Sequence, residues 1–166
     1  MSDQTNNTSR RLVAVVVTHN RLDKLKPTVD RLLDSDPAHL HAVVIVDNAS
    51  TDGTAAWLAT LTNPRIDLVT SKVNLGGAGG VETGMRHAVA QHDPDWLVVM
   101  DDDARPFPGA LEAFHDLPPE KWDAIAAAVY FPDGRICEMN RPSRNPFWHW
   151  RLFLRTFRKG RNGFHI

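Results

Sequence analysis

The sequence contains a single cysteine, Cys137, and it lacks any long apolar run. One cysteine excludes a disulfide within the chain and argues against a cysteine-based zinc site. Apolar runs such as Leu12–Val17 are far shorter than the roughly 20 residues that span a bilayer. Residues 1–10 are polar and have no apolar segment typical of a secretory signal. We therefore expect a cytoplasmic protein.

Acidic residues are missing between Arg141 and Ile166, where seven basic residues lie. Residues 1–140 carry 20 acidic and 12 basic residues, so the overall charge of −1 combines two unlike parts. The acidic body would repel a phosphate backbone, and no nucleic-acid partner is expected. The eight histidines show no metal-ligand spacing, and we interpret them as surface or packing residues.

Three segments are apolar at every position: residues 12–17, 42–46 and 96–100. Such continuous runs are typical of strands covered on both faces, as in a parallel sheet. Residues 66–70 form a fourth, weaker candidate. Helical patterns lie between these segments. The alternation predicts an α/β fold with a mostly parallel central sheet flanked by helices.

The helices are expected from apolar spacing and capping residues. Asn20 is a candidate N-cap for the first helix, which we expect to start late or bend at Pro27. Thr51 or Asp52 would cap the second. The third helix is expected over residues 78–91. After residue 103 we expect a short helix over 108–117 and two strands over 124–130 and 135–139. The apolar face of the third helix would consist of Val81, Met85, Ala88 and Val89.

Polar residues follow each of the three strong strand candidates. The first ends in Thr18-His19-Asn20, the second in Asp47-Asn48-Ala49-Ser50, and the third in Asp101-Asp102-Asp103. Because parallel strands end at the same edge of a sheet, the clusters should meet where α/β proteins bind ligands. For Asn20 and Ser50 the alternative is simple helix or turn capping.

The three adjacent aspartates predict a cation. Neighbouring carboxylates repel one another unless a positive charge neutralises them. In extended backbone Asp101 and Asp103 point the same way, and their oxygens suit Mg²⁺ or Mn²⁺. The alternative is a solvated acidic loop.

A glycine-rich stretch, Asn74–Gly80, precedes the third expected helix. Glycine lets the backbone approach a ligand closely, and a helix N-terminus favours anions. A dinucleotide fingerprint should follow the first strand, which this stretch does not, and the Walker lysine is absent. Close packing of loop and helix is the alternative explanation.

Together these motifs resemble family 2 glycosyltransferases of the Rossmann-like GT-A fold. The resemblance rests on Val15–Arg21, Val46–Thr54, Asn74–Gly80 and Met100–Asp103, and it covers about residues 11–131. The glycine stretch and the triple aspartate are most similar to the galactofuranosyl and rhamnosyl transferase branch. The resemblance implies metal-dependent, inverting transfer of a sugar from a UDP- or dTDP-linked donor to a glycan or lipid-linked acceptor.

The resemblance also implies roles for individual residues. Thr18 and Asn20 would line the nucleotide pocket, and Asp47 would accept a hydrogen bond from the nucleobase, supported by Asn48 and Ser50. Asp101 and Asp103 would hold Mn²⁺ or Mg²⁺, with Asp102 toward the ribose or sugar. The residues lying against the nucleotide or its diphosphate would be Asn74, Gly76 and Gly77.

Family members place a carboxylate general base well after the triple aspartate, and this chain has no acid after Glu138. We therefore expect a donor-binding part without its base: a polar tail (1–10), a nucleotide-sugar-binding domain (11–139) and a basic aromatic tail (140–166). One alternative is a non-catalytic nucleotide-sugar-binding fragment that needs another segment or chain. Another is a sugar-1-phosphate nucleotidyltransferase, although Thr18–Arg21 lacks the glycines of that class.

Residues 147–159 could form a basic amphipathic helix with Trp150, Phe153, Leu154 and Phe157 on one face. Such a helix suits peripheral contact with the inner face of a membrane. The alternative is a core-facing helix, whose exposed apolar face would favour a homo-oligomer.

Overall fold

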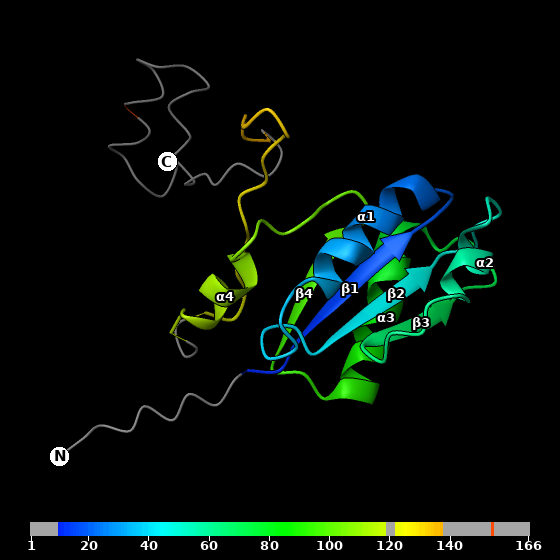
Figure 1. Cartoon of the computed structure of the whole chain (residues 1–166), viewed down its shortest axis with the longest axis horizontal. Coiled ribbons are helices and arrows are strands. Elements are labelled where there is room, and N and C mark those ends of the chain that lie inside the picture. The colour runs from blue at the N-terminus through cyan, green and yellow to red at the C-terminus, as the bar shows by residue number, and fades with distance from the viewer. Residues whose placement is uncertain (1–9, 119–121, 138–153, 155–166) are drawn as a thin grey trace. The chain divides into compact units, whose positions relative to one another are not determined.

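The computed structural model describes residues 10–118, 122–137 and Leu154 (Figure 1). Its centre is a four-stranded parallel sheet in the order β3-β2-β1-β4. The strands are β1 (Leu12–Thr18), β2 (Ala42–Asp47), β3 (Ile66–Thr70) and β4 (Trp96–Asp101). The strands expected over residues 12–17, 42–46, 66–70 and 96–100 are confirmed, and so is the α/β class.

Helices connect the strands and follow the last one. They are α1 (Leu22–Leu33), α2 (Thr54–Leu58), α3 (Gly76–His92) and α4 (Ala110–His115). The two central strands, β1 and β2, are buried along almost their whole length, as their continuous apolar runs predict. The outer strand β4 is only partly covered, and Val99 is 42% exposed.

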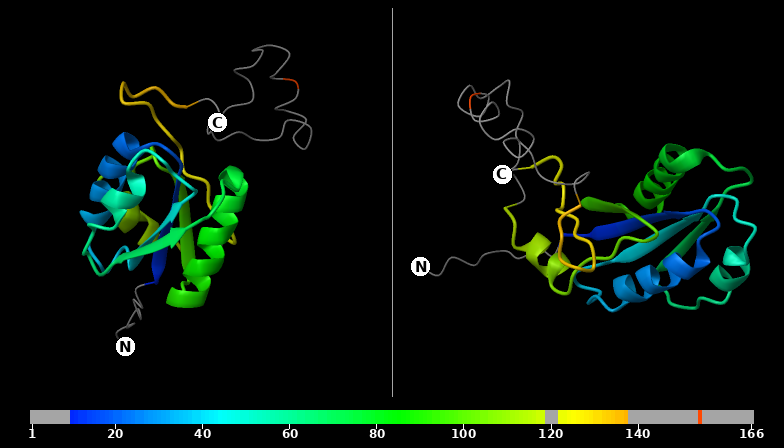
Figure 2. Two further views of the ribbon diagram at one scale, coloured as in Figure 1. Left: turned by 90° about the vertical axis from the view of Figure 1, so that its right-hand side faces the viewer. Right: turned by 90° about the horizontal axis from the view of Figure 1, so that it is seen from above.

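The helices cover both faces of the sheet (Figure 2). On one face, Leu25, Val29 and Leu32 of α1 pack with Leu58 of α2 against the sheet. On the other face, α3 lies alone and buries Ala88 against alternate valines of β1 and β2. This two-sided burial fixes the strand ends, because a slip of one residue would exchange the two faces.

The packed face of α3 differs from the expected one. The buried residues are Gly80, Gly84 and Ala88, whereas Met85 is 38% and Val89 57% exposed. A Cβ on Gly84 would come within 2.5 Å of Val15 Cγ1, and one on Gly80 within 2.5 Å of a Val17 methyl. The prediction is confirmed for Ala88 but wrong for Met85 and Val89, because α3 approaches the sheet mainly through glycines, which hydrophobic spacing does not reveal.

Other local expectations also fail. The first helix begins at Leu22 and runs through Pro27, with Arg21 rather than Asn20 at its N-cap. Asn20 instead takes a left-handed backbone (φ 54°) in the turn before the helix. In place of the strands expected over 124–130 and 135–139, the described part has an isolated bridge between Tyr130 and Ile136 around a turn.

Contacts divide the chain into two compact units, residues 1–117 and 118–166. All eight helices and strands named above belong to the first. The domain boundaries expected at residues 10 and 139 stay a prediction, and the amphipathic helix expected over 147–159 lies outside the described residues apart from Leu154. No helix in the described part of the chain is both long and apolar enough to cross a bilayer.

Candidate functional site

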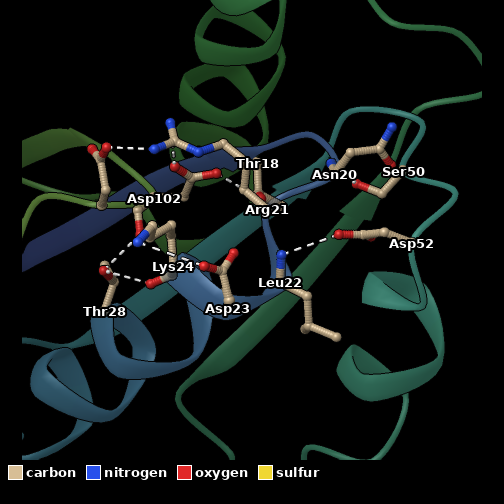
Figure 3. A network of polar contacts seen from close by, with 11 residues as sticks. Thr18, Asn20, Arg21, Leu22, Asp23, Lys24, Thr28, Ser50, Asp52 and Asp102 are labelled. Carbon is tan, nitrogen blue, oxygen red and sulfur yellow. Dashed lines mark hydrogen bonds and ion pairs between the residues drawn. The ribbon is translucent and has the colours of Figure 1, made fainter.

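The strand ends bring the predicted polar residues to one edge of the sheet. In the strand register Thr18 lies beside Asp47, Asp47 beside Thr70, and Val17 beside Asp101. The loops that follow these strands therefore start side by side at the carboxyl edge, where parallel sheets bind ligands. Figure 3 shows the part of this edge formed by the loops after β1, β2 and β4.

The middle aspartate points into the protein. Asp102 is only 3% exposed, and its Oδ2 accepts a hydrogen bond of 2.8 Å from the Thr18 hydroxyl. Its Oδ1 lies 3.1 Å from Nη1 of Arg21. Burial raises the pKa of Asp102 above its ordinary value, although Thr18 and Arg21 oppose that shift. Asp102 thus anchors the loop after β4 rather than facing the exposed side of the edge.

The flanking aspartates face outward. Asp101 is exposed at the end of β4, and the side chain of Asp103 is 47% exposed. Asp103 Oδ2 accepts a hydrogen bond of 2.5 Å from Nη2 of Arg21, and this contact raises the pKa of Arg21. Asp102 and Asp103 lie in a turn after β4, where the Ala104 N–H donates to the Asp101 carbonyl at 3.1 Å, and not in the extended backbone that the sequence analysis assumed.

Asn48 connects the end of β2 to the glycine loop. Its Nδ2 donates to Asn74 Oδ1 (3.0 Å) and to the Gly76 carbonyl (3.1 Å), while its Oδ1 accepts the Leu75 N–H (2.9 Å). Asn74 Oδ1 also accepts the Gly76 N–H at 2.8 Å. Asn48 is 2% exposed whereas residues 74–76 are exposed, so a buried side chain fixes a surface loop at the edge.

Asp47, Ser50 and Asn20 form a second connected group. The Ser50 N–H donates to Asp47 Oδ1 at 2.9 Å, and the Asn20 N–H donates to Ser50 Oγ at 3.0 Å. Asn20 Oδ1 accepts the Thr51 N–H at 2.6 Å. The loops after β1 and β2 are therefore tied together. Asp47 Oδ2 has no hydrogen-bond partner among the residues described here.

Open space surrounds the start of α3. A Cβ added to Gly76 or Gly77 would meet no atom within 4 Å, and Gly76 has φ +71°, which favours glycine. No side chain caps the helix, and its first turn contains no acidic residue. Asn74 Oδ1 takes the Gly76 N–H, whereas the next N–H groups of the first turn have no side-chain partner among the described residues, and the helix dipole favours an anion there.

The structure reveals three contributors to the site that the sequence analysis did not assign. Arg21 bridges Asp102 and Asp103, and Thr28 donates to the Asp102 carbonyl at 2.7 Å. Asp52 accepts the Leu22 N–H at 3.2 Å, which links the loop after β2 to α1. A signal existed for Arg21, because a basic residue follows the first strand as closely as the aspartates follow the last.

Two histidines expected at the surface or in packing converge on a carboxylate. His87 Nε2 lies 2.6 Å and His92 Nε2 3.2 Å from Asp67 Oδ2, near the amino end of β3. Among the described residues, no group of three His, Cys, Asp or Glu side chains could hold a metal ion by itself. Asp101 and Asp103 offer two accessible carboxylates, which fits a Mg²⁺ or Mn²⁺ ion that draws its other ligands from phosphate and water.

The parallel sheet and the polar edge place the protein in the GT-A class of α/β folds. The chain belongs to glycosyl transferase family 2, whose family model matches residues 13–166. The alternation of strands and helices that defines the fold lies inside this match, as does the whole edge formed by Thr18, Asp47, Asn74 and Asp101.

Two curated relatives represent different parts of the family. Galactofuranosyltransferase GlfT1 of Mycolicibacterium smegmatis is 41% identical over 95 residues, covering 56% of this chain and 30% of the relative. Undecaprenyl-phosphate mannosyltransferase of Micrococcus luteus is 29% identical over 150 residues, covering 84% and 56%. The chain therefore spans only about a third to a half of the length of these relatives.

Solved structures agree with the fold. Mannosyltransferase PcManGT from Pyrobaculum calidifontis, in complex with GDP-Man and Mn²⁺, superposes with a TM-score of 0.59 at 27% identity, covering 76% of this chain and 38% of that one. TarS 1-349 of S. aureus, in complex with UDP-GlcNAc, has a TM-score of 0.54 at 21% identity, covering 64% and 30%. The second likeness supports the fold alone.

Proposed function

We propose that this chain forms the donor-binding part of a metal-dependent, inverting glycosyltransferase. The enzyme would transfer a sugar from a UDP- or dTDP-linked donor to a glycan or lipid-linked acceptor. The observation that carries the proposal is the convergence of Asp47, the Asn74–Gly77 loop and Asp101/Asp103 at one edge of the sheet. Asp47 supplies a hydrogen-bond acceptor for the nucleobase, the glycine loop supplies N–H donors for the phosphates, and Asp101 and Asp103 supply carboxylates for a cation.

The nucleobase would lie beside Asp47. The Ser50 N–H holds Oδ1 of this carboxylate, which leaves Oδ2 to accept an N–H from uracil or thymine. Asn20 and Ser50 keep the two flanking loops together, so their role is to shape the pocket. Thr18 is 2% exposed and bonds Asp102, and we assign it to the floor of the site.

The diphosphate would lie against Gly76 and Gly77 at the start of α3. The space above both glycines and the first-turn N–H groups that follow Gly76 provide room and donors for an anion. Asn48 would act indirectly, because its amide nitrogen and oxygen both hold the loop. Asn74 holds the loop through Oδ1, and its Nδ2 would be the group that lies toward the nucleotide or its diphosphate.

Asp101 and Asp103 would hold the divalent cation, and the buried Asp102 would set their direction. When bound, Mn²⁺ or Mg²⁺ would supply a Lewis acid that neutralises the leaving nucleoside diphosphate. The Mn²⁺ complex of the Pyrobaculum mannosyltransferase supports a divalent metal in this fold. Titration of the protein with each metal would show which of Mn²⁺ and Mg²⁺ it binds more tightly.

Calorimetry with UDP in the presence of Mn²⁺ tests donor binding. In Asp47→Asn the side chain still accepts the Ser50 N–H but gains an N–H₂ where the base would donate, so affinity should fall at least about tenfold. Asp36→Asn is the matched control, because that carboxylate also accepts a backbone N–H (from Ala38, 2.8 Å) but follows α1 away from the edge. No heat at millimolar UDP would refute the proposal.

Sugar transfer is tested with a panel of nucleotide sugars and a lipid-linked acceptor. Release of UDP or dTDP with formation of a glycosylated acceptor would establish the reaction, and an inverted anomeric centre its stereochemistry. Binding without transfer would identify a donor-binding module that needs another segment or chain to provide the general base. Pyrophosphate release from a sugar-1-phosphate and a nucleoside triphosphate would instead indicate a nucleotidyltransferase.

A lipid-linked acceptor would require access to a membrane. We assign that contact to residues 147–159, on the basis of their basic and aromatic composition. The chain should sediment with anionic liposomes at low salt and remain in the supernatant at high salt. If liposomes fail to bind and light scattering shows self-association, residues 147–159 serve as a packing surface and the protein is a homo-oligomer.

A further inference from the structure

One arginine holds two of the three aspartates at the edge of the sheet. Arg21 Nη1 lies 3.1 Å from Asp102 Oδ1, and Nη2 lies 2.5 Å from Asp103 Oδ2. Arg21 is also the N-cap of α1, so its backbone position is fixed by the helix. Figure 3 shows its guanidinium lying over Asp102 and Thr18.

The two contacts differ in character. The side chain of Asp102 is 4% exposed, and it keeps the Thr18 hydroxyl as a second partner. Asp103 is 47% exposed, and among the described residues Arg21 is its side chain's partner. The pair with Asp103 is therefore the more easily exchanged, because water screens it and no other contact holds it.

The charge of Arg21 occupies the place where a divalent cation would act. A cation on Asp101 and Asp103 would stand next to a guanidinium already bonded to Asp103, and like charges at such distances repel. Either the guanidinium leaves Asp103, or the cation binds against its charge. The same positive charge offsets the repulsion between the neighbouring carboxylates of Asp102 and Asp103.

We propose that Arg21 is a positioning residue that neutralises Asp102 and Asp103 before a divalent cation binds and that releases Asp103 when the cation arrives. This inference rests on the proposed role of Asp101 and Asp103. A nucleoside diphosphate offers the freed guanidinium a new anion and the cation its remaining ligands. Cation and nucleotide should therefore bind cooperatively, and the coupling between them must be the same in both directions.

Titration of Mn²⁺, followed by the electron paramagnetic resonance signal of the free ion, tests this directly. Without nucleotide, Arg21→Gln should bind Mn²⁺ about three- to fivefold more tightly than the unmodified chain, the upper part of the range that loss of a half-exposed ion pair allows. Addition of UDP should strengthen Mn²⁺ binding more in the unmodified chain than in Arg21→Gln.

The matched control is Lys24→Gln. Lys24 is as exposed as Arg21 and carries the same charge three residues later, but its ion pair is with Asp23 (3.5 Å). Its Mn²⁺ affinity should stay within about twofold of the unmodified chain, since an exposed charge outside the site is screened. The Mn²⁺ affinity of Arg21→Lys should lie between those of the unmodified chain and Arg21→Gln, because a lysine ammonium is a point charge that cannot bond two carboxylates as the guanidinium does.

The possible outcomes distinguish the role of Arg21 from the proposed metal site. If Arg21→Gln and Lys24→Gln bind Mn²⁺ equally while UDP strengthens binding in both, Arg21 has no such role and the proposed function stands. If no variant binds Mn²⁺ even with UDP, the metal site and this inference both fail. Should Arg21→Gln not fold, judged by its thermal unfolding without metal, Arg21→Lys carries the test, and equality with the unmodified chain overturns the inference.

Discussion

The hydroxyl of Thr28 donates a hydrogen bond of 2.7 Å to the backbone carbonyl of Asp102, 74 residues away in the sequence. Both residues are buried. The bond joins the middle of α1 to the loop that follows β4, and it holds the backbone from which Asp101 and Asp103 project. Stability of the helix and placement of the carboxylates are therefore linked.

Thr28→Val should test this link. Valine has nearly the shape of threonine but leaves the buried Asp102 carbonyl without its donor, so we expect a loss of about 1–2 kcal/mol in unfolding free energy. Urea denaturation measures the loss. The control is Thr83→Val, whose hydroxyl bonds only the Gly79 carbonyl one turn earlier in α3. Equal stability of the two variants would mean that the Thr28 bond contributes nothing net.

Gly84→Ala should destabilise the contact between α3 and the sheet. The new Cβ would lie 2.5 Å from Val15 Cγ1 and 2.8 Å from Val46 Cγ2, and both valines are fully buried. Overpacking of this kind costs about 1–3 kcal/mol, which exceeds the gain of about 1 kcal/mol from replacing glycine in a helix.

Gly77→Ala is the matched variant, because its Cβ would enter open space. We expect unchanged or slightly higher thermal stability for it, together with weaker UDP binding if the diphosphate lies against this residue. A Gly84→Ala protein as stable as Gly77→Ala would show that α3 moves outward without cost.

Asn48→Asp should loosen the glycine loop. The carboxylate keeps an acceptor for the Leu75 N–H but removes the donor to Asn74 Oδ1 and the Gly76 carbonyl. We expect faster hydrogen exchange at the amides of Leu75 and Gly76 and a stability loss of about 2–3 kcal/mol, because a buried charge would face two acceptors. Exchange rates in α2 provide the internal reference. Unchanged exchange at Leu75 would contradict the role given to Asn48.

Asp52 should make the protein sensitive to acid. The Thr54 hydroxyl, 2.6 Å from Asp52 Oδ1, lowers the pKa of this carboxyl below its ordinary value of 3.8. Since folding favours the ionised form, its stabilisation is complete above about pH 4 and is lost as the pH falls through the lowered pKa.

Urea unfolding at about pH 5 and pH 3 would measure that effect. The unmodified chain should lose more stability between these conditions than Asp52→Asn, which keeps the acceptor but not the charge. Asp30→Asn, at an exposed carboxylate of α1 whose side chain has no hydrogen bond among the described residues, should lose as much as the unmodified chain. An acid response of Asp52→Asn equal to that of the unmodified chain would exclude the assignment.

The sheet could be predicted because its signal is local. Continuous apolar runs at β1 and β2 reflect burial on both faces, and polar residues directly after β1, β2 and β4 had to meet at one edge. The inward direction of Asp102 could not be predicted, because it depends on Thr18 and Arg21, which approach it from another strand and a loop. The packed face of α3 was missed because hydrophobic spacing gives glycine no weight.

The glycines of α3 also determine where the ligand-facing loop stands. With Gly80 and Gly84 against the valines of β1 and β2, the helix rests on the sheet without spacers, and its first turn is carried along as the end of a rigid rod. The distance of Gly76 and Gly77 from the sheet thus depends on the lack of a side chain at Gly80 and Gly84, later in the same helix. If the diphosphate lies against Gly76 and Gly77 as proposed, substitutions at Gly80 or Gly84 would change nucleotide affinity without contacting the nucleotide.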